Sequence, residues 1–137
     1  MTRKTLTVVS ALALLAVLAW GARFGLRLRQ ELKAKTTITR MSMLMGVLDT
    51  EKPAEVSGPA ALRPLLEKYN RTECLEDAWG NPFVIEKEKS GAYRVLSLGR
   101  DGRRGSCCGG RVADWDSDAV LLGDEWLQVW YPKAAGT

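Results

Sequence analysis

The sequence predicts an α+β fold, in which a long N-terminal helix packs on a small antiparallel sheet. An uncharged run dominated by leucine, alanine and valine occupies residues 5–22, and an apolar stripe at helical spacing follows it. Nearer the C-terminus, short stretches alternate between two sets of side chains, as strands do. Because the helical part precedes the strands, the two are expected to pack as separate layers. A chain of 137 residues has room for one small globular domain and no second core.

The uncharged run from Thr5 to Ala22 is long enough to cross a membrane. At about 1.5 Å per residue it reaches about 27 Å, close to the thickness of the hydrocarbon layer. Residues 1–4 form a basic N-terminus before it. A cleaved signal peptide has a similar pattern, but bulky Trp20 stands where a cleavage site needs a small residue. We therefore expect a retained, single transmembrane helix over 5–22 that continues as a helix over 23–50.

Basic residues gather directly after this run, and the formal net charge of the chain is +4. They are Arg23, Arg27, Arg29, Lys33, Lys35 and Arg40. Their place beside an apolar segment favours phospholipid headgroups over nucleic acid as the partner. The positive-inside rule alone would leave the C-terminal part in the cytoplasm, whereas the cysteines favour an oxidising compartment outside it.

The second half of the long helix is expected to pack on the sheet through its apolar stripe. The stripe consists of Ile38, Met41, Met45 and Leu48, with Leu44 beside them. The helix is expected to end before Pro53, whose ring cannot continue it. Residues 51–59 are predicted to be a linker and residues 60–69 a second, short helix, with Pro64 favouring a start near Arg63.

The strands are predicted from alternation and from turn chemistry. Trp79-Gly80-Asn81-Pro82 is typical of a turn, because Gly80 tolerates a positive φ and proline pushes the residue before it toward an extended conformation. Residues 83–87 and 93–98 then predict a hairpin, and residues 126–131 a final strand. The globular domain is expected to cover residues 51–137.

Histidine is absent from the sequence, which removes the commonest general base and the usual zinc and Ser-His-Asp chemistries. We therefore expect the chain not to be an enzyme. The three cysteines, Cys74, Cys107 and Cys108, lack Cys-x-x-Cys spacing, and one disulfide with one thiol left over is the simplest count. A bridge from Cys74 to Cys107 or Cys108 would contribute about 3–4 kcal/mol. A vicinal bridge and buried reduced thiols remain alternatives.

Residues 98–118 form a loop rich in glycine and aspartate, with too few apolar residues to hold its shape by burial. Its carboxylates are Asp101, Asp114, Asp116 and Asp118. Carboxylates brought close together repel unless a cation neutralises them, and calcium takes six to eight oxygen ligands. We therefore expect calcium to order this loop. A solvated acidic loop beside its own arginines is the alternative. In a second calcium interpretation, Asp114 to Glu125 would be an EF-hand loop, but Ala119 stands where such a loop needs glycine.

Two motifs carry a family resemblance. Asp77-x-Trp-Gly-Asn-Pro-Phe83 is followed by Tyr93-x-x-x-Ser-Leu-Gly-x-Asp-Gly102 and a closing Asp116-x-Asp118. Over residues 30–120 the chain thus resembles the major pseudopilin of bacterial type II secretion. The resemblance implies a pilin-like fold, a calcium loop over 98–118, and as ligands the Leu98 carbonyl, Asp101, Asp116 and Asp118, with Asp114 as a looser candidate.

The resemblance also implies a place in the cell. Such subunits sit in the bacterial inner membrane by a single pass, with the globular domain in the periplasm, and assemble with copies of themselves and with other secretion-apparatus subunits. The start of the chain departs from the family's leader pattern, because Lys4-Thr5-Leu6-Thr7 has no glycine before it and no acidic residue occurs before Glu31. The alternative function is therefore an uncleaved, membrane-anchored, calcium-binding periplasmic module that binds a partner without polymerising.

Overall fold

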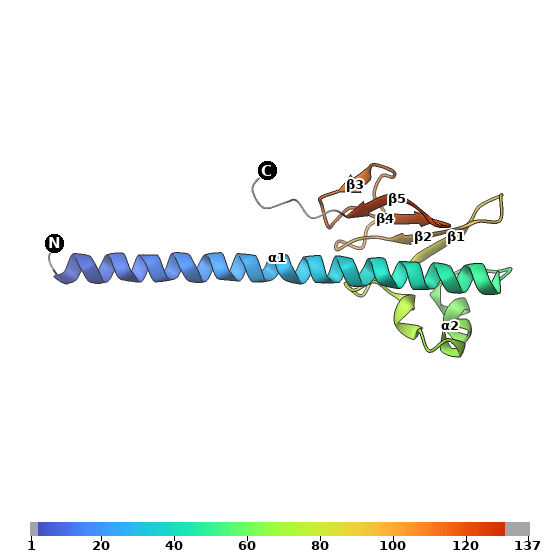
Figure 1. The fold of residues 1–137 in the computed structure, drawn as a ribbon, viewed down its shortest axis with the longest axis horizontal. Helices are drawn as coiled ribbons and strands as arrows, with labels where there is room; N and C mark the ends of the chain where they lie inside the picture. The colour runs from blue at the N-terminus through green and yellow to red at the C-terminus, as the bar shows by residue number, and fades with distance from the viewer. Residues whose placement is uncertain (1–2, 131–137) are drawn as a thin grey trace. The chain divides into compact units, whose positions relative to one another are not determined.

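The computed structural model describes residues 3–130, and residues 1–2 and 131–137 lie outside the described part. The expected α+β, pilin-like arrangement is confirmed: a long N-terminal helix is followed by a sheet of five strands (Figure 1). The elements in chain order are α1 (Arg3–Glu51), α2 (Pro59–Lys68), the 3-10 helix η1 (Thr72–Leu75), β1 (Val84–Lys87), β2 (Tyr93–Ser97), β3 (Gly110–Val112), β4 (Ala119–Leu122) and β5 (Glu125–Trp130).

The sheet is mostly antiparallel, in the order β1-β2-β4-β5-β3. Val95 in β2 pairs with Leu121 in β4, and Val120 in β4 pairs with Gln128 in β5. Among the strands of residues 3–130, only β3 runs parallel to its neighbour, with Arg111 opposite Val129. The long connection from β2 to β4 therefore leaves the sheet, adds β3 at the edge beside β5, and returns to the centre. This connection is the predicted loop over 98–118.

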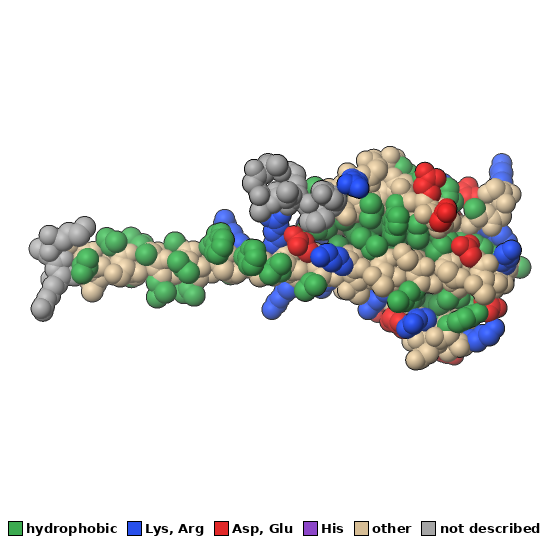
Figure 2. Space-filling view, in the orientation of Figure 1, with side chains coloured by type: hydrophobic (Ala, Val, Ile, Leu, Met, Phe, Trp, Pro, Cys, Tyr) green, Lys and Arg blue, Asp and Glu red, His purple; other side chains and the backbone are tan. Residues whose placement is uncertain are grey.

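The chain divides into two compact units, one up to Leu32 and one from Lys33 onward. In the first unit the large apolar side chains are exposed along α1, as Figure 2 shows; Leu12 and Trp20, for example, are 61% and 70% exposed. This part of the helix is long and apolar enough to cross a membrane, a criterion that a signal sequence or the core helix of a soluble protein also meets. Because its apolar side chains are exposed rather than packed in a core, the first unit fits the expected membrane helix.

The core of the second unit forms where α1 meets the sheet and α2. In Figure 1 the sheet and α2 are seen on opposite sides of this part of α1. The predicted stripe is confirmed, because Met41, Leu44, Met45 and Leu48 are buried and Ile38 packs against the core. These side chains join Leu62 and Leu66 of α2 and Phe83, Val95 and Leu121 of the sheet region in one hydrophobic cluster.

The predicted hairpin and final strand are present as β1, β2 and β5, whereas β3 and β4 were not predicted. The end of the predicted final strand, Tyr131, lies outside the described residues. β3 lies inside the predicted loop; its three residues offer no alternation and are ordered by the backbone of β5. The short helix α2 begins at Pro59 and not near Arg63, and it holds Pro64 in its interior. Pro59 suits the first position of the helix, because the backbone N–H that proline lacks would have no hydrogen-bond partner within the helix there.

Candidate metal site

Asp77 holds the turn that supports the glycine- and aspartate-rich loop. Its side chain is 1% exposed, and its Oδ1 accepts hydrogen bonds from the backbone nitrogens of Trp79 and Asn81, both at 2.9 Å. Its Oδ2 accepts a hydrogen bond of 2.9 Å from Oγ of Ser97, at the end of β2. Ser97 Oγ in turn accepts a hydrogen bond from the backbone nitrogen of Gly99. One buried carboxylate therefore ties the turn to the start of the loop.

The second half of α1 positions this turn through two polar side chains. Thr37, which is fully buried, accepts a hydrogen bond of 3.0 Å at its Oγ1 from the backbone nitrogen of Ala78. Arg40 donates from Nη1 to the carbonyl oxygens of Glu76 and Asp77, both at 3.1 Å. The turn is thus docked on the helix as well as on the sheet.

Asn81 and Gly99 pack the start of the loop against its end. Asn81 Nδ2 donates to the Gly99 carbonyl at 2.9 Å, and the Arg100 backbone nitrogen donates to the Trp115 carbonyl at 2.7 Å. Gly99 has a φ of 71°, and a Cβ there would lie 2.6 Å from the carbonyl oxygen of Ser117. The segments around residues 99–102 and 115–117 are therefore in backbone contact, which brings the two ends of the loop together.

Asp118 is the buried carboxylate of the loop. Its side chain is 2% exposed, and its Oδ2 accepts a hydrogen bond of 3.0 Å from the backbone nitrogen of Gly105. Its Oδ1 is buried and has no hydrogen-bond partner among the described residues. Burial raises the pKa of Asp118 above its usual range, and the negative charge of Asp101 adds to the rise.

Because the pKa of Asp118 is raised, its ionised form is unfavourable in the folded protein. Because the pKa is higher in the folded than in the unfolded state, the folded protein binds more protons between the two values. The stability gained from protonated Asp118 is fully present below the unfolded pKa of about 3.9 and is lost as the pH rises through the raised value. At neutral pH a positive charge beside Asp118 would therefore stabilise the fold.

Asp116 is neutralised by an arginine of the same loop. Arg100 Nε donates to Asp116 Oδ1 and Arg100 Nη2 to Oδ2, both at 2.7 Å, in a two-pronged ion pair. The guanidinium holds the pKa of Asp116 below its usual range. This carboxylate contributes stability above its unfolded pKa, which is lost as the pH falls through the lowered value.

The other expected ligands lie nearby in separate local contacts. Asp101 Oδ1 accepts a hydrogen bond of 2.9 Å from the backbone nitrogen of Arg103, and Asp114 Oδ1 accepts one of 3.0 Å from that of Asp116. Leu98 directly follows β2 at the start of the loop. Arg104 pairs with Glu86 of β1 at 2.7 Å, so the loop is also attached to the first hairpin.

The fit of calcium to these residues is partial. In the described part of the chain, no three carboxylate, cysteine or histidine side chains already converge as a metal site. Asp118 nevertheless offers a buried oxygen without a partner, and Asp101 is close enough to act on its charge. A calcium ion would be coordinated by these oxygens. Asp116 could join them only if its ion pair with Arg100 opened. When bound, it would supply positive charge beside Asp118, whose burial outweighs the stabilising effects of the Gly105 hydrogen bond and the Arg104 charge.

The EF-hand interpretation of residues 114–125 is wrong. Ala119 begins β4, and Glu125 begins β5 after the hairpin turn, so the residues after Asp118 form a sheet and not the rest of a calcium loop.

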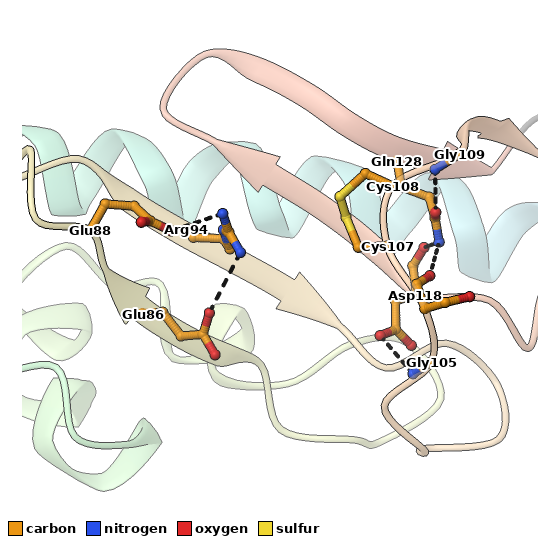
Figure 3. The surroundings of a disulfide bond; sticks show 10 residues. Glu86, Glu88, Arg94, Gly105, Cys107, Cys108, Gly109, Asp118 and Gln128 are labelled. Atoms are coloured by element: carbon orange, nitrogen blue, oxygen red, sulfur yellow. Dashed lines mark hydrogen bonds and ion pairs between the residues drawn. A yellow bond between two sulfur atoms is a disulfide. The ribbon is translucent and has the colours of Figure 1, made fainter.

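Gln128 on β5 fastens the middle of the loop, a role that was not predicted. It is 3% exposed; its Oε1 accepts from the Gly109 nitrogen and its Nε2 donates to the Asp118 carbonyl, both at 2.8 Å (Figure 3). A glutamine between Trp126 and Trp130 on the same face of a strand was the signal that could have revealed it.

The structure places Cys74 apart from Cys107 and Cys108, whereas a bridge between Cys74 and one of them was expected. The sulfur atoms of Cys107 and Cys108 lie against each other within the loop, close to Gln128 (Figure 3). Cys74 lies buried in the core as a free thiol, and burial raises its pKa. The polar contacts described above attach the loop between Leu98 and Asp118 to the rest of the fold.

Comparison with known protein families finds a match. The model of a family described as type II secretion system (T2SS), protein G matches residues 30–114. This range covers more than half of the chain and includes the second half of α1, β1, β2 and both motif turns, and it ends at Asp114, before Asp116 and Asp118. No curated protein and no solved structure was found to match the chain.

Proposed function

Because the chain belongs to the type II secretion system protein G family, we propose that it is a membrane-anchored, pseudopilin-like subunit that supports protein export. The apparatus is a type II secretion system or a related type IV pilus-like one. The family is a structural component of secretion, and we propose a structural role for this chain. The observation that carries the proposal is the family match over residues 30–114, from the second half of α1 to β3, combined with an α+β fold of pilin type.

The exposed apolar side chains of α1 support the membrane anchor. Leu6, Leu12, Leu18 and Trp20 are each more than half exposed, in a helix long enough to span a bilayer. Leaving such a surface in water is unfavourable by about 25 cal/mol per Å². We propose a single pass through the bacterial inner membrane with the second unit in the periplasm.

The partners follow from the family. We propose that the chain assembles with other pseudopilin or secretion-apparatus subunits and with copies of itself. The alternative, an anchored module that binds a partner without polymerising, gains no support from the family match.

We further propose that calcium stabilises the loop over 98–118. The unpartnered, buried Oδ1 of Asp118 supports this, together with the nearby charge of Asp101. The residues that would hold the ion are Asp101, Asp118 and the Leu98 carbonyl, with Asp116 available when Arg100 releases it and Asp114 as a looser ligand.

Deletion of the gene for this chain from its own bacterium tests the proposed function. We expect exported proteins to accumulate in the periplasm, and re-expression of the full chain to restore their release. A matched variant in which residues 1–22 are replaced by a cleavable signal peptide should leave the second unit soluble in the periplasm and should not restore release, because the anchor is lost. Unchanged export without the chain would contradict the secretion role, and full restoration by the soluble variant would contradict the need for the anchor.

A further inference from the structure

The apolar surface of α1 does not end where the uncharged run ends, at Ala22. Beyond it, large apolar side chains that are 43–63% exposed are interleaved with exposed arginines of the same unit. This mixture suits neither water, because of its apolar part, nor hydrocarbon, because of its charges. We call residues 20–32 the boundary segment. Its apolar residues after the uncharged run are Phe24, Leu26, Leu28 and Leu32, and its arginines are Arg23, Arg27 and Arg29.

An aromatic pair marks the start of the boundary segment. The rings of Trp20 and Phe24 stack with centroids 5.8 Å apart and planes inclined by 13°, and the two side chains are 70% and 52% exposed. Tryptophan is enriched where the hydrocarbon of a bilayer meets its headgroups, because its ring is apolar and its N–H is polar. We therefore place the edge of the hydrocarbon at Trp20.

This depth brings the arginines to the headgroups. At about 1.5 Å per residue, Arg23 and Arg29 lie about 5 and 14 Å beyond Trp20 along the helix. The headgroup layer is about 5–8 Å thick on each side of a bilayer. Arginine side chains are long enough to bend back over several ångströms, so all three guanidinium groups can reach the phosphates.

The positive charge of the boundary segment exceeds what its own carboxylate can neutralise. Arg27 Nε lies 3.3 Å from Oε1 of Glu31, and the Arg27 side chain is still 45% exposed. Within residues 3–130, no ion pair is found for Arg23 or Arg29, and both side chains are exposed. A guanidinium binds a phosphate through two parallel hydrogen bonds, so these arginines can each hold a headgroup.

The arginines surround the helix and do not line one face. With 3.6 residues per turn, Arg23 and Arg27 lie about 40° apart around the axis, whereas Arg29 lies about 120–160° from them. A partner helix would cover one side of α1, whereas lipids surround it. The distribution of charge therefore fits a ring of lipid headgroups.

We propose that the boundary segment binds anionic phospholipids in preference to zwitterionic ones. The inference rests on the membrane anchor of the proposed function and adds a class of lipid to it. Arg23, Arg27 and Arg29 pair with the headgroups, while Trp20 and the exposed apolar residues of the segment contact the adjoining acyl chains. Phosphate occurs in both classes of lipid, and the net negative charge of the anionic class supplies the preference.

The test places the full chain in vesicles that contain phosphatidylglycerol and phosphatidylcholine. In each of two preparations one of these lipids carries bromine on its acyl chains, which quenches a tryptophan that it contacts. Subtracting the signal of the Trp20→Phe variant removes the other four tryptophans of the chain and leaves the quenching of Trp20. The two quenching curves give the association constant of each lipid beside Trp20.

Three variants divide charge from position. The first carries Arg23→Gln, Arg27→Gln and Arg29→Gln together and removes the charges. The second carries lysine at the same three positions and keeps them. The third removes three exposed charges of the second unit, through Arg63→Gln, Lys89→Gln and Arg103→Gln.

We expect the wild type to prefer phosphatidylglycerol about five-fold, the attraction of about one basic residue to an anionic surface. The preference should fall to about one in the glutamine variant of the boundary segment. It should stay within about two-fold of the wild type in the lysine variant and be unchanged in the variant of the second unit. In 1 M salt the preference of the wild type should fall, because the charges are screened.

Equal association of both lipids with the wild type would overturn the lipid preference and leave the anchor standing. An undiminished preference in the glutamine variant of the boundary segment would show that the arginines do not cause it. Quenching by both lipids that falls as the ratio of protein to lipid rises would show that a second copy covers the segment, and would overturn the proposal. Absence of quenching by either lipid would do the same, and would overturn the anchor too if the chain failed to float with the vesicles.

Discussion

Replacement of Asp77 by alanine is expected to lower the free energy of unfolding by about 3 kcal/mol, because it leaves three donors without their acceptor. These are the backbone nitrogens of Trp79 and Asn81 and the hydroxyl of Ser97, which is fully buried. A protein of this size is stable by about 5–15 kcal/mol, so the loss is a large fraction of the total. Urea unfolding of the full chain in micelles, monitored by tryptophan fluorescence, measures it.

Asp77→Asn is the matched control for this loss. The amide oxygen can still accept from Trp79 and Asn81, while the amide nitrogen faces Ser97, whose hydroxyl can accept as well as donate. We expect it to lose about 1 kcal/mol. If Asp77→Ala were as stable as the wild type, the turn would not depend on the buried carboxylate.

Replacement of Gly99 by alanine is the second large effect, and it acts by steric contact. The new Cβ would lie 2.6 Å from the Ser117 carbonyl oxygen and 2.7 Å from that of Trp115, in a backbone with a φ of 71°. Both neighbours are backbone atoms, which cannot rotate away, so the two ends of the loop must separate. Left-handed backbone and overpacking together cost about 3 kcal/mol. The same urea experiment measures the change.

Gly91→Ala separates the steric contact from backbone strain. Gly91 also has a positive φ, of 91°, but a Cβ there would meet no atom within 4 Å. We expect it to cost about 1 kcal/mol, from the conformation alone. Equal losses at Gly91 and Gly99 would show that the two ends of the loop are not in tight contact.

The helices and the central hairpin could be predicted because their signals are local. The apolar stripe from Ile38 to Leu48 repeats at helical spacing, and the two turns that flank residues 83–87 carry glycine or proline. β4 was missed because Ala119–Leu122 is apolar throughout, as a central strand between β2 and β5 can be, and so does not alternate. β3 was missed because a three-residue edge strand is ordered by its neighbour and not by its own sequence.

The sequence predicted which residues make up the loop, but not which of their side chains contact one another. The aspartates and glycines of residues 98–118 are evident in the sequence, yet which carboxylate is buried depends on packing: Asp118 lies under the loop and Asp116 at its surface. The Arg100–Asp116 pair joins residues 16 positions apart, and the side-chain amide of Gln128 contacts residues 10 to 22 positions away. Local sequence patterns do not predict contacts over such separations.

Thermal unfolding of the full chain in micelles, in excess calcium and in chelator, tests most directly whether a cation completes the loop. The Asp118→Asn variant is measured in parallel, and magnesium at the same concentration controls for ionic strength. We expect calcium at 100 times its Kd to add about 2.7 kcal/mol to the wild type and to raise its Tm by several degrees. In chelator, Asp118→Asn should melt about 4 °C above the wild type, because the buried charge is gone while one side-chain oxygen still accepts from Gly105, and calcium should have no effect on it. Identical melting of the wild type in calcium and in chelator would show that the loop holds no calcium.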